Sequence, residues 1–347
     1  MSADLRIAVI GCGAVSEMFH LPALAGIGRT PAWLIDKNRE RAERLAKGWG
    51  GTRAASDYQA CLGKFDAAIV ALPHHLHAPV CSDLLARGVH LLVEKPLANT
   101  SAECETILSS AKQGGSVLAV GLMRRFLHVA QWVKAALEAG VLGEIESFDV
   151  REGFVYGWPV ASDFFFRKET AGGGVLLDTG AHTLDLLLAW LGEAQFFEYR
   201  DDDFGGVEAD CELRLTLASG AKGVVELSRT RNLRNTARIR GSKGEIEVGL
   251  TRNTLEANPR SLLRFKAGKR DGRKLPEQKL PELFRLQLED WLEAITAGRP
   301  PRVSGSEGAR AIHLIEACYA KRQRLNLPWV SPVEDRGRDK SKEVVGC

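Results

Sequence analysis

Three side chains in this sequence suit proton and hydride exchange at a carbon that carries a hydroxyl group. Lys95 stands in the sequence Val93-Glu94-Lys95-Pro96, and Asp178 and His182 follow more than 80 residues later. A lysine stabilises an alkoxide-like oxygen with its positive charge, and a histidine can exchange a proton near neutral pH. A helix would place Asp178 and His182, four residues apart, on one face, where the carboxylate could orient the imidazole. The predicted catalytic set is Lys95, Asp178 and His182.

Each of these residues also has a purely structural explanation. Acidic side chains favour the start of a helix because they accept hydrogen bonds from its free amides, so Asp178 could simply cap a helix that runs into Leu184 to Leu191. Lys95 alone fits a surface lysine, and His182 alone fits a hydrogen-bonded core histidine. The segments upstream in the chain favour the catalytic interpretation.

The beginning of the chain has the pattern of a dinucleotide-binding turn. An apolar run from Leu5 to Ile10 leads into Gly11-Cys12-Gly13-Ala14-Val15-Ser16, and a helical pattern runs from about Val15 to Ala25. The first glycine permits a tight turn, the second lets the backbone approach a pyrophosphate, and the helix start offers free amides. Ser16 stands where a third glycine or alanine is usual. The predicted cofactor contacts in this turn are Gly11, Cys12, Gly13, Ala14 and Val15.

Asp36 predicts which dinucleotide binds. It ends the next apolar run, Ala32 to Ile35, and lies 23 residues after Gly13, close to the spacing of the acid that binds an adenosine ribose. An acid there accepts hydrogen bonds from both ribose hydroxyls and repels a 2′-phosphate, which favours NAD. Lys37, Arg39 and Arg41 follow and could neutralise such a phosphate, so NADP stays open as the alternative.

Strands and helices alternate as far as about residue 122, which predicts a parallel sheet. Further strands are predicted at Asp66 to Leu72, His90 to Val93 and Val117 to Val120, with helices at Pro73 to Gly88 and Ser101 to Gln113. The predicted fold class is α/β, with an N-terminal Rossmann domain over residues 1–122.

After a predicted helix at Val129 to Glu138, the pattern changes to alternating, half-exposed strands. These are predicted at Ile145 to Phe154, Ala209 to Ala218, Gly223 to Thr230 and Thr236 to Arg240, with turns at Asp201 to Gly206, Ser219-Gly220 and Gly241 to Gly244. Helices at about Pro281 to Ala297 and Gly305 to Arg324 follow. Residues 123–330 are therefore predicted to form a C-terminal α+β domain with a large, mostly antiparallel sheet for substrate binding and oligomerisation, and residues 331–347 a polar tail.

Composition fits a protein of two domains. The chain has 347 residues, 45% apolar content and a net charge of +3, enough for sizeable cores and without a strong charge preference. We expect a cytoplasmic protein, since neither a signal segment nor an apolar run of membrane-spanning length is visible. The seven cysteines show no CxxC pair and are predicted to be reduced structural thiols.

Taken together, these motifs resemble the family of glucose-fructose oxidoreductase, inositol dehydrogenase and rhizopine catabolism MocA-like proteins (Gfo/Idh/MocA). The resemblance covers roughly Ile7 to Trp329. It rests on Gly11-Cys12-Gly13 with His20-Leu21-Pro22, Leu72-Pro73 with His77, Val93-Glu94-Lys95-Pro96, Gly121 with Arg125-Phe126, Gly173-Gly174 with Asp178-Thr179-Gly180-Ala181-His182 and Asp185, and Arg299-Pro300-Pro301.

The resemblance implies that the nicotinamide lies between the two domains, with Lys95 beneath the reactive carbon and His182 as the general acid or base beside Asp178. It also implies a cis peptide bond before Pro96 and a pairing of subunits through the outer face of the second sheet. The cofactor contacts that it adds are Leu72, Pro73, His74, His77, Glu94, Lys95, Pro96 and Arg167, beside Asp36, Lys37 and Arg41; the substrate contacts are Lys95, Arg125, Asp178 and His182.

Some of these positions depart from the family pattern or allow another explanation. His74 stands where many members have asparagine, and Phe166 where a tryptophan often precedes the residue matching Arg167, which could equally be solvated. The run His74-His75-Leu76-His77 suggests a metal site, but no cluster of cysteines or acids accompanies it at ligand spacing, so no metal is predicted.

A basic segment lies in the second half of the chain. Residues 229–274 hold 14 Lys or Arg against four acids, with Arg229/Arg231 and Arg238/Arg240 spaced to share a strand face. Such a face could hold a phosphorylated or nucleotide-linked sugar, or an acidic partner; a solvated or subunit-facing sheet is preferred. Aromatic residues do not interleave with these charges, so no nucleic-acid partner is predicted.

The predicted function is an NAD(P)-dependent oxidoreductase that acts on a secondary alcohol or ketone of a sugar, cyclitol or nucleotide sugar, a small polyhydroxylated substrate. Two alternatives share the cofactor site: a glycosidase or lyase that uses transient oxidation, and a sensor without catalysis. The intact set of Lys95, Asp178 and His182 argues against the sensor. A homodimer or homotetramer is expected from the resemblance.

Overall fold

The computed structural model describes residues 5–157, 163–203 and 206–327. Its first sheet has six strands, all parallel, in the order β3-β2-β1-β4-β5-β6. Helices lie on its faces, so β1, β4 and β6 are buried throughout and read as continuous apolar runs. The strands are β1 (Ile7–Ile10), β2 (Trp33–Ile35), β3 (Arg53–Ala55), β4 (Ala67–Val70), β5 (His90–Val93) and β6 (Leu118–Val120). The predicted Rossmann-like parallel sheet is confirmed.

The helices of this half begin and end where the sequence supplies caps. In α4 (Ser101–Gly114), Thr100 Oγ1 accepts a hydrogen bond from Glu103 N, and the Glu103 carboxylate accepts one from Thr100 N. Gly115 then ends the helix at a φ of +62°. The other helices are α1 (Leu21–Gly26), preceded by a π-helical turn at Ser16–His20, α2 (Arg39–Ala46) and α3 (His77–Ala86), which starts after a 3-10 turn at His74–Leu76.

The second sheet has eight strands in the order β13-β12-β11-β7-β10-β9-β8-β16. Among the described strands of this sheet, only β7–β10 and β8–β16 pair in parallel, so the predicted mostly antiparallel sheet is confirmed. Its strands are β7 (Ile145–Gly153), β8 (Ala194–Asp201), β9 (Asp210–Leu217), β10 (Lys222–Ser228), β11 (Thr236–Gly241), β12 (Gly244–Gly249), β13 (Leu255–Asn258) and β16 (Gln323–Arg324). A two-stranded ribbon, β14 (Lys266–Ala267) and β15 (Arg270–Asp271), lies outside it.

Several predicted boundaries in this half are wrong. Strand β8 was missed, and Asp201, assigned to a turn, is its last residue. The helix predicted to continue to Arg324 ends at Ala320 as α9 (Gly305–Ala320), because Gln323–Arg324 pair with β8. The predicted tail, residues 331–347, lies outside the described residues.

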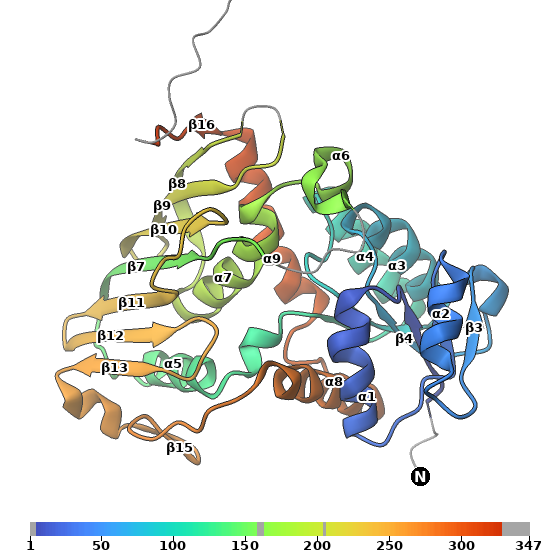
Figure 1. Ribbon diagram of the computed structural model, residues 1–347. Helices are drawn as coiled ribbons and strands as arrows, with labels where there is room; N and C mark the ends of the chain where they lie inside the picture. The colour runs from blue at the N-terminus through green and yellow to red at the C-terminus, as the bar shows by residue number, and fades with distance from the viewer. Residues whose placement is uncertain (1–4, 158–162, 204–205, 328–347) are drawn as a thin grey trace, which may run out of the picture.

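Helices α5 (His128–Glu138), α7 (Val175–Leu191) and α9 gather on one face of the second sheet (Figure 1). Helix α7 is the central one: 14 of its 17 residues are buried. Gly180 lets it approach the sheet, since a Cβ there would lie 2.9 Å from Leu227 Cδ1. The residues at the start of α7 are thereby held between the two sheets.

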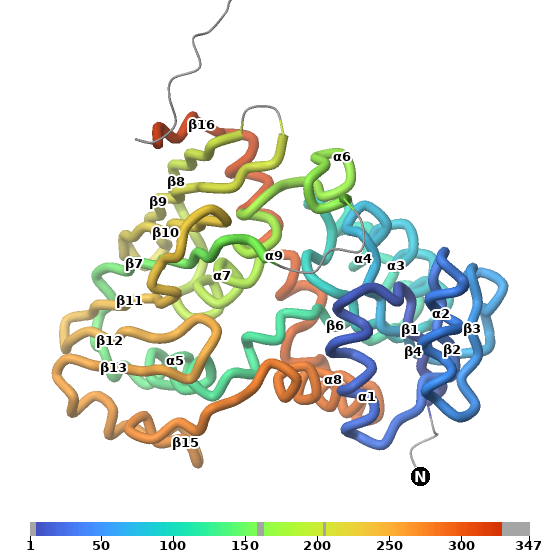
Figure 2. The backbone as a smooth tube through the Cα atoms, viewed as in Figure 1, coloured from blue at the N-terminus to red at the C-terminus, as the bar shows by residue number. Residues whose placement is uncertain are grey.

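The last long helix, α8 (Leu280–Ala297), returns to the first half of the molecule. It lies beside α1 (Figure 2), and Phe19 stacks on Phe284 with ring centroids 4.8 Å apart. Trp291 is fully buried in the same core. The two halves are therefore joined by packing as well as by the connection after β6.

Two compositional predictions can be compared with the structure. Cysteines 12, 61, 81, 104, 211 and 318 are buried and free, as predicted; Cys347 lies outside the described residues. None of the helices in the described parts of the chain is both long enough and apolar enough to span a bilayer.

Candidate active site

The glycine turn after β1 has the shape that the sequence predicts. Gly11 has a φ of +94°, and a Cβ there would lie 2.1 Å from Ala71 O, so only glycine fits. A Cβ on Gly13 would meet nothing within 4 Å, so the backbone there stays open to a phosphate group. Ser16 is buried and donates a hydrogen bond from Oγ to Gly11 O at 2.6 Å, which fastens the helix to the turn in place of a third glycine.

Asp36 lies beside this turn at the end of β2. Its Oδ2 accepts a hydrogen bond from Cys12 N at 2.8 Å, and its Oδ1 accepts one from Asn38 N at 2.7 Å. Arg41 Nη1 is 3.7 Å from Oδ2, whereas Lys37 is exposed. The carboxylate is thus fixed where an adenosine ribose would reach it, with one arginine alongside.

The histidines after β4 brace the backbone. His77 is buried, with Nδ1 2.8 Å from Pro96 O and Nε2 2.9 Å from Leu72 O, and so links the loops that follow β4 and β5. His74 Nδ1 lies 2.9 Å from Ala171 O, and His75 Nδ1 3.2 Å from Thr170 O, both in or beside the short helix α6 (Lys168–Ala171). Burial lowers the pKa of His74 to about 3, and the neighbouring His77 adds to the shift. His74 is therefore neutral and donates from Nδ1.

These three histidines do not form a metal site. Each hydrogen-bonds a backbone carbonyl, and the described residues contain no group of three His, Cys, Asp or Glu side chains that could hold a metal ion. The structure thus places His74 and His77 beside the predicted site, with their rings in contact with backbone carbonyls, and their predicted cofactor contacts stay a prediction.

Lys95 is presented at the carboxyl end of β5 by the residues on either side of it. The Glu94 carboxylate contacts His20 Nε2 at 2.8 Å and accepts a hydrogen bond from Lys95 N at 3.2 Å. It packs on Gly121, where a Cβ would lie 3.1 Å from it. The Lys95-Pro96 peptide bond is cis, as the resemblance predicts.

Asp178 does not cap its helix. At the start of α7 the free amides of Gly174 and Leu176 both donate at 2.9 Å to the buried carboxylate of Glu208, and Val175 N donates to Glu208 O at 2.9 Å. Tyr319 Oη also donates to this carboxylate, at 2.7 Å. Because Glu208 caps the helix from the facing loop, the Asp178 side chain is left for another task, and the capping explanation is wrong.

Asp178 instead joins two cations. Its Oδ1 forms a very short ion pair with Lys95 Nζ, which also donates to Asp178 O at 3.2 Å. Its Oδ2 lies 2.7 Å from Arg229 Nη2. Burial alone would raise the pKa of Asp178, but the charges of Lys95 and Arg229 lower it well below the ordinary value. The carboxylate stays ionised and cannot deliver a proton at neutral pH.

His182 lies one turn further along α7 and is 6% exposed. Burial and the positive charges of Arg124 and Lys95 lower its pKa well below the ordinary value, although Asp178 opposes the shift. Arg124 is held by a bidentate pair with Glu152 at 2.7 and 2.8 Å. Among the described residues His182 Nδ1 has no hydrogen-bond partner. The imidazole is neutral, the form needed to accept a proton from an alcohol.

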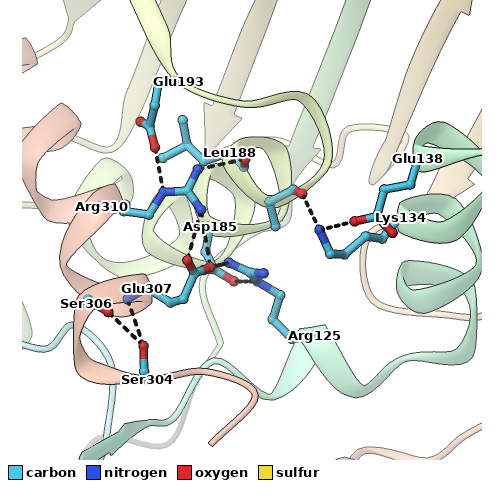
Figure 3. A network of polar contacts seen from close by, with 11 residues as sticks. Arg125, Lys134, Glu138, Asp185, Leu188, Glu193, Ser304, Ser306, Glu307 and Arg310 are labelled. Carbon is cyan, nitrogen blue, oxygen red and sulfur yellow. Dashed lines mark hydrogen bonds and ion pairs between the residues drawn. The ribbon is translucent and has the colours of Figure 1, made fainter. Parts of the chain in front are cut away.

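Two predicted contacts are not brought to this site. Arg125 forms a bidentate pair with Asp185, at 2.6 and 2.7 Å, and a third contact with Glu307 at 3.0 Å (Figure 3). Arg167 pairs with Asp163 at 2.6 Å, and both side chains are about two-thirds exposed. The predicted substrate contact of Arg125 and cofactor contact of Arg167 therefore find no support in this geometry.

Arg229 is the site residue that the sequence analysis missed. It was grouped with Arg231 on a solvated or subunit-facing strand, yet its side chain is 7% exposed and reaches Asp178. Arg231 pairs instead with Asp210 and Glu226. The place of Arg229 at the end of a strand could have revealed it. Arg229 directly follows β10, and because β10 runs parallel to β7, the residue lies where the carboxyl ends of parallel strands meet.

Comparison with known proteins agrees with this geometry. The model of an oxidoreductase family with an NAD-binding Rossmann fold matches residues 5–122, and that of its C-terminal alpha/beta domain matches residues 134–330. A D-glucoside 3-dehydrogenase of Escherichia coli is 34% identical over 199 residues, which is 55% of each chain. The chain thus spans about half the length of that relative.

Other matches extend over most of the chain. A dTDP-3,4-didehydro-2,6-dideoxy-alpha-D-glucose 3-reductase of Actinomadura kijaniata is 28% identical over 93% of this chain and 97% of the relative. The crystal structure of aldose-aldose oxidoreductase from Caulobacter crescentus has 25% identity and a TM-score of 0.77, over 91% of this chain and 97% of that one. The chain therefore belongs to the Gfo/Idh/MocA oxidoreductase family, and its first domain is the NAD-binding Rossmann fold of that family.

Proposed function

We propose that this protein is an NAD(P)-dependent oxidoreductase that acts on a secondary alcohol or ketone of a sugar, cyclitol or nucleotide sugar. The observation that carries the proposal is the meeting of Lys95 and Asp178 between the two sheets, with the neutral His182 one turn away. Lys95 and Asp178 keep 19% and 16% of their side-chain surface exposed, so a small molecule can reach them.

The residues divide the work of such a reaction. A nicotinamide cofactor held by the turn from Gly11 to Val15 and by Asp36 would supply the acceptor for the hydride that leaves the substrate carbon in oxidation. Lys95 donates a hydrogen bond to the reacting oxygen and stabilises the charge that develops there. His182 accepts the hydroxyl proton in oxidation and returns it in reduction, since its lowered pKa leaves the imidazole free to accept.

The cofactor site favours NAD. Gly13 leaves room for a pyrophosphate at the start of a helix, and the Asp36 carboxylate is fixed beside it. A 2′-phosphate would be repelled by this carboxylate, while Arg41 at 3.7 Å supplies a partial counterweight. NADP is therefore the weaker second cofactor. The finer cofactor contacts proposed are Gly11 to Val15, Leu72, Pro73 and Glu94 to Pro96.

The experiment is to follow NADH absorbance while the purified protein and NAD are incubated with pooled inositols, sugars, sugar phosphates and nucleotide sugars. The expected result is a rise that Lys95→Ala abolishes. Lys134→Ala, which removes an exposed lysine paired with Glu138, is the matched control and keeps the wild-type rate. Absence of NADH formation and of ketone reduction, with NAD bound, would contradict the proposal; a leaving group released without net NADH would indicate transient oxidation.

The location and the oligomeric assembly of the protein are proposed as well. We expect a cytoplasmic homodimer or homotetramer without a nucleic-acid or membrane partner. The support is the second sheet, whose helices α5, α7 and α9 gather on one face (Figure 1), while the other carries charged side chains such as Arg151, Glu226 and Arg238. Light scattering of the purified protein gives the mass, and a monomer at micromolar concentration would refute the assembly.

A further inference from the structure

Arg229 is a buried cation that the proposed reaction does not yet use. Its side chain is 7% exposed, and its Nη2 lies 2.7 Å from Asp178 Oδ2. The guanidinium lies over the ring of Tyr156, 5.0 Å from the centroid. An arginine this buried has to be neutralised by a partner, and Asp178 is the acid that it contacts.

The backbone around Arg229 is fixed by both neighbouring strands. Arg229 N donates to Ala209 O at 2.8 Å, and Arg229 O accepts a hydrogen bond from Tyr156 N at 3.0 Å. Those neighbours follow β7 and precede β9, which flank β10 in the sheet. The side chain thus leaves a rigid strand end instead of a loop free to move, and its direction toward Asp178 is set before any substrate arrives.

The two cations divide the Asp178 carboxylate between them. Lys95 contacts Oδ1 and Arg229 contacts Oδ2, so a rotation of the carboxylate would break both ion pairs. Arg229 therefore fixes the plane of the Asp178 carboxylate, and through it the position of the Lys95 ammonium.

Arg229 also sets the charge of the site. Lys95 and Asp178 alone would cancel, whereas the group of Lys95, Arg229 and Asp178 carries two positive charges and one negative charge. The surplus positive charge favours the alkoxide-like oxygen that develops as the hydroxyl proton leaves. Asp178 can then hold Lys95 in place while the site keeps the positive charge that stabilises the substrate oxygen.

We propose that Arg229 is a positioning residue of the reaction, which fixes the Asp178 carboxylate against Lys95 and preserves a net positive charge for the substrate oxygen. This inference rests on the proposed oxidoreductase function. The competing explanation is purely structural: Arg229 only neutralises a buried acid, in which case its loss lowers stability and leaves the chemistry of the folded enzyme unchanged.

The test compares Arg229→Met and Arg229→Lys with the matched control Arg231→Met, which removes a cation paired with Asp210 and Glu226, away from Asp178. We expect Arg229→Met to lower kcat by about fiftyfold, less than the roughly hundredfold or greater loss of a donor that contacts the oxyanion itself, with KM changed less than about threefold. Arg229→Lys restores part of kcat, since it keeps the charge but lacks the planar fork. Arg231→Met keeps the wild-type kcat.

A second measurement does not depend on turnover. ¹³C NMR of labelled aspartate, assigned by Asp178→Asn, reports the titration of Asp178. Arg229 lowers the pKa of this carboxyl, so in Arg229→Met the titration of Asp178 moves to higher pH. NAD binding and urea unfolding identify the folded fraction of each variant.

The outcomes separate the two proposals. An active wild type whose kcat and Asp178 titration are unchanged in Arg229→Met would overturn the positioning role and leave the oxidoreductase intact. A wild type without activity on any pool would defeat the oxidoreductase, and the titration would still decide whether Arg229 holds Asp178 ionised. A lower kcat that persists after correction for folded protein, together with the shifted titration, supports the proposal.

Discussion

Helix α7 carries two aspartates with opposite electrostatic behaviour. Asp178 and Asp185 are seven residues apart, two helical turns, and each accepts a hydrogen bond from an arginine at 2.6 to 2.7 Å. Charges lower the pKa of Asp178, whereas burial raises that of Asp185 and the nearby Glu307 adds to the increase. An ion pair by itself therefore does not determine how an acid titrates.

The difference lies in the charges around each carboxylate. Asp178 has two cations to itself, Lys95 and Arg229. Asp185 belongs to a cluster in which two arginines face three acids, as Figure 3 shows; its members are Arg125, Arg310, Asp185, Glu193 and Glu307. A surplus of cations occurs where an oxyanion must be stabilised, while the acid-rich cluster ties α7 to α9 and to the turn before α5.

Neutralising Asp178 and Asp185 in turn tests most directly whether their surroundings give them different roles. Asp178→Asn should lower kcat/KM by about a thousandfold, because Lys95 loses its anchor and faces Arg229 without the intervening anion. Asp185→Asn should leave kcat/KM of the folded enzyme within about threefold, since its cluster does not reach the site. Steady-state kinetics of NADH formation measure both; comparable losses in the two variants would show that the clusters are not separate.

Removing Arg125 from the acid-rich cluster should chiefly lower the stability of the fold. Arg125→Met leaves the Asp185 carboxylate, 1% exposed, without its main partner, and breaking a buried pair in this way costs about 3–5 kcal/mol. Urea unfolding gives the free energy of unfolding. A full-stability variant with a raised KM would instead restore Arg125 as a substrate contact.

His182 lies near the cations Arg124 and Lys95, and the pH dependence of the reaction should reflect their effect on its pKa. Its lowered pKa means that the proton-accepting form persists below the ordinary value of about 6.5, so kcat/KM for oxidation should stay flat through the pH at which an ordinary imidazole is half protonated and fall only at lower pH. Removing the positive charge in Arg124→Gln raises the pKa and moves this limb toward neutral pH. Arg124→Lys, which keeps the charge, is the control; an identical limb in all three proteins would exclude Arg124 as a cause.

The sequence predicted the cofactor turn and the Lys95 motif better than it predicted the contacts of Asp178. Glycines 11 and 13, Asp36 and the motif around Lys95 are local patterns, since each depends on a turn or strand end within a few residues, and the structure places them as expected. The predicted pairing of Asp178 with the imidazole of His182 is different. Both lie on α7, but the Asp178 oxygens bond Lys95 and Arg229, which come from distant parts of the chain.

The residues that the sequence analysis missed or assigned to the wrong contact share a physical reason. Arg229, Glu208 and Arg125 act through partners more than 30 residues away, so no local pattern reveals them. Glu208 takes over the capping of α7 from a loop, which is why capping by Asp178 looked plausible from sequence. Arg125 was assigned to the substrate by its motif, whereas its guanidinium is saturated by Asp185 and Glu307.

The smallest predicted effect concerns Arg310, at the rim of the acid-rich cluster. Its side chain is 26% exposed and its partner Glu193 is 61% exposed, so Arg310→Gln should lower the free energy of unfolding at pH 7 by no more than about 1 kcal/mol. The deficit should shrink as the pH falls. Arg310 attracts Asp185 only while that carboxylate is ionised, and the raised pKa means that Asp185 takes up its proton in the folded protein before it does so in the unfolded chain. Urea unfolding of both proteins between pH 7 and pH 4 measures this; a deficit that stays constant on acidification would mean that Arg310 stabilises the fold through contacts such as Leu188 O, which do not titrate, rather than through the acids.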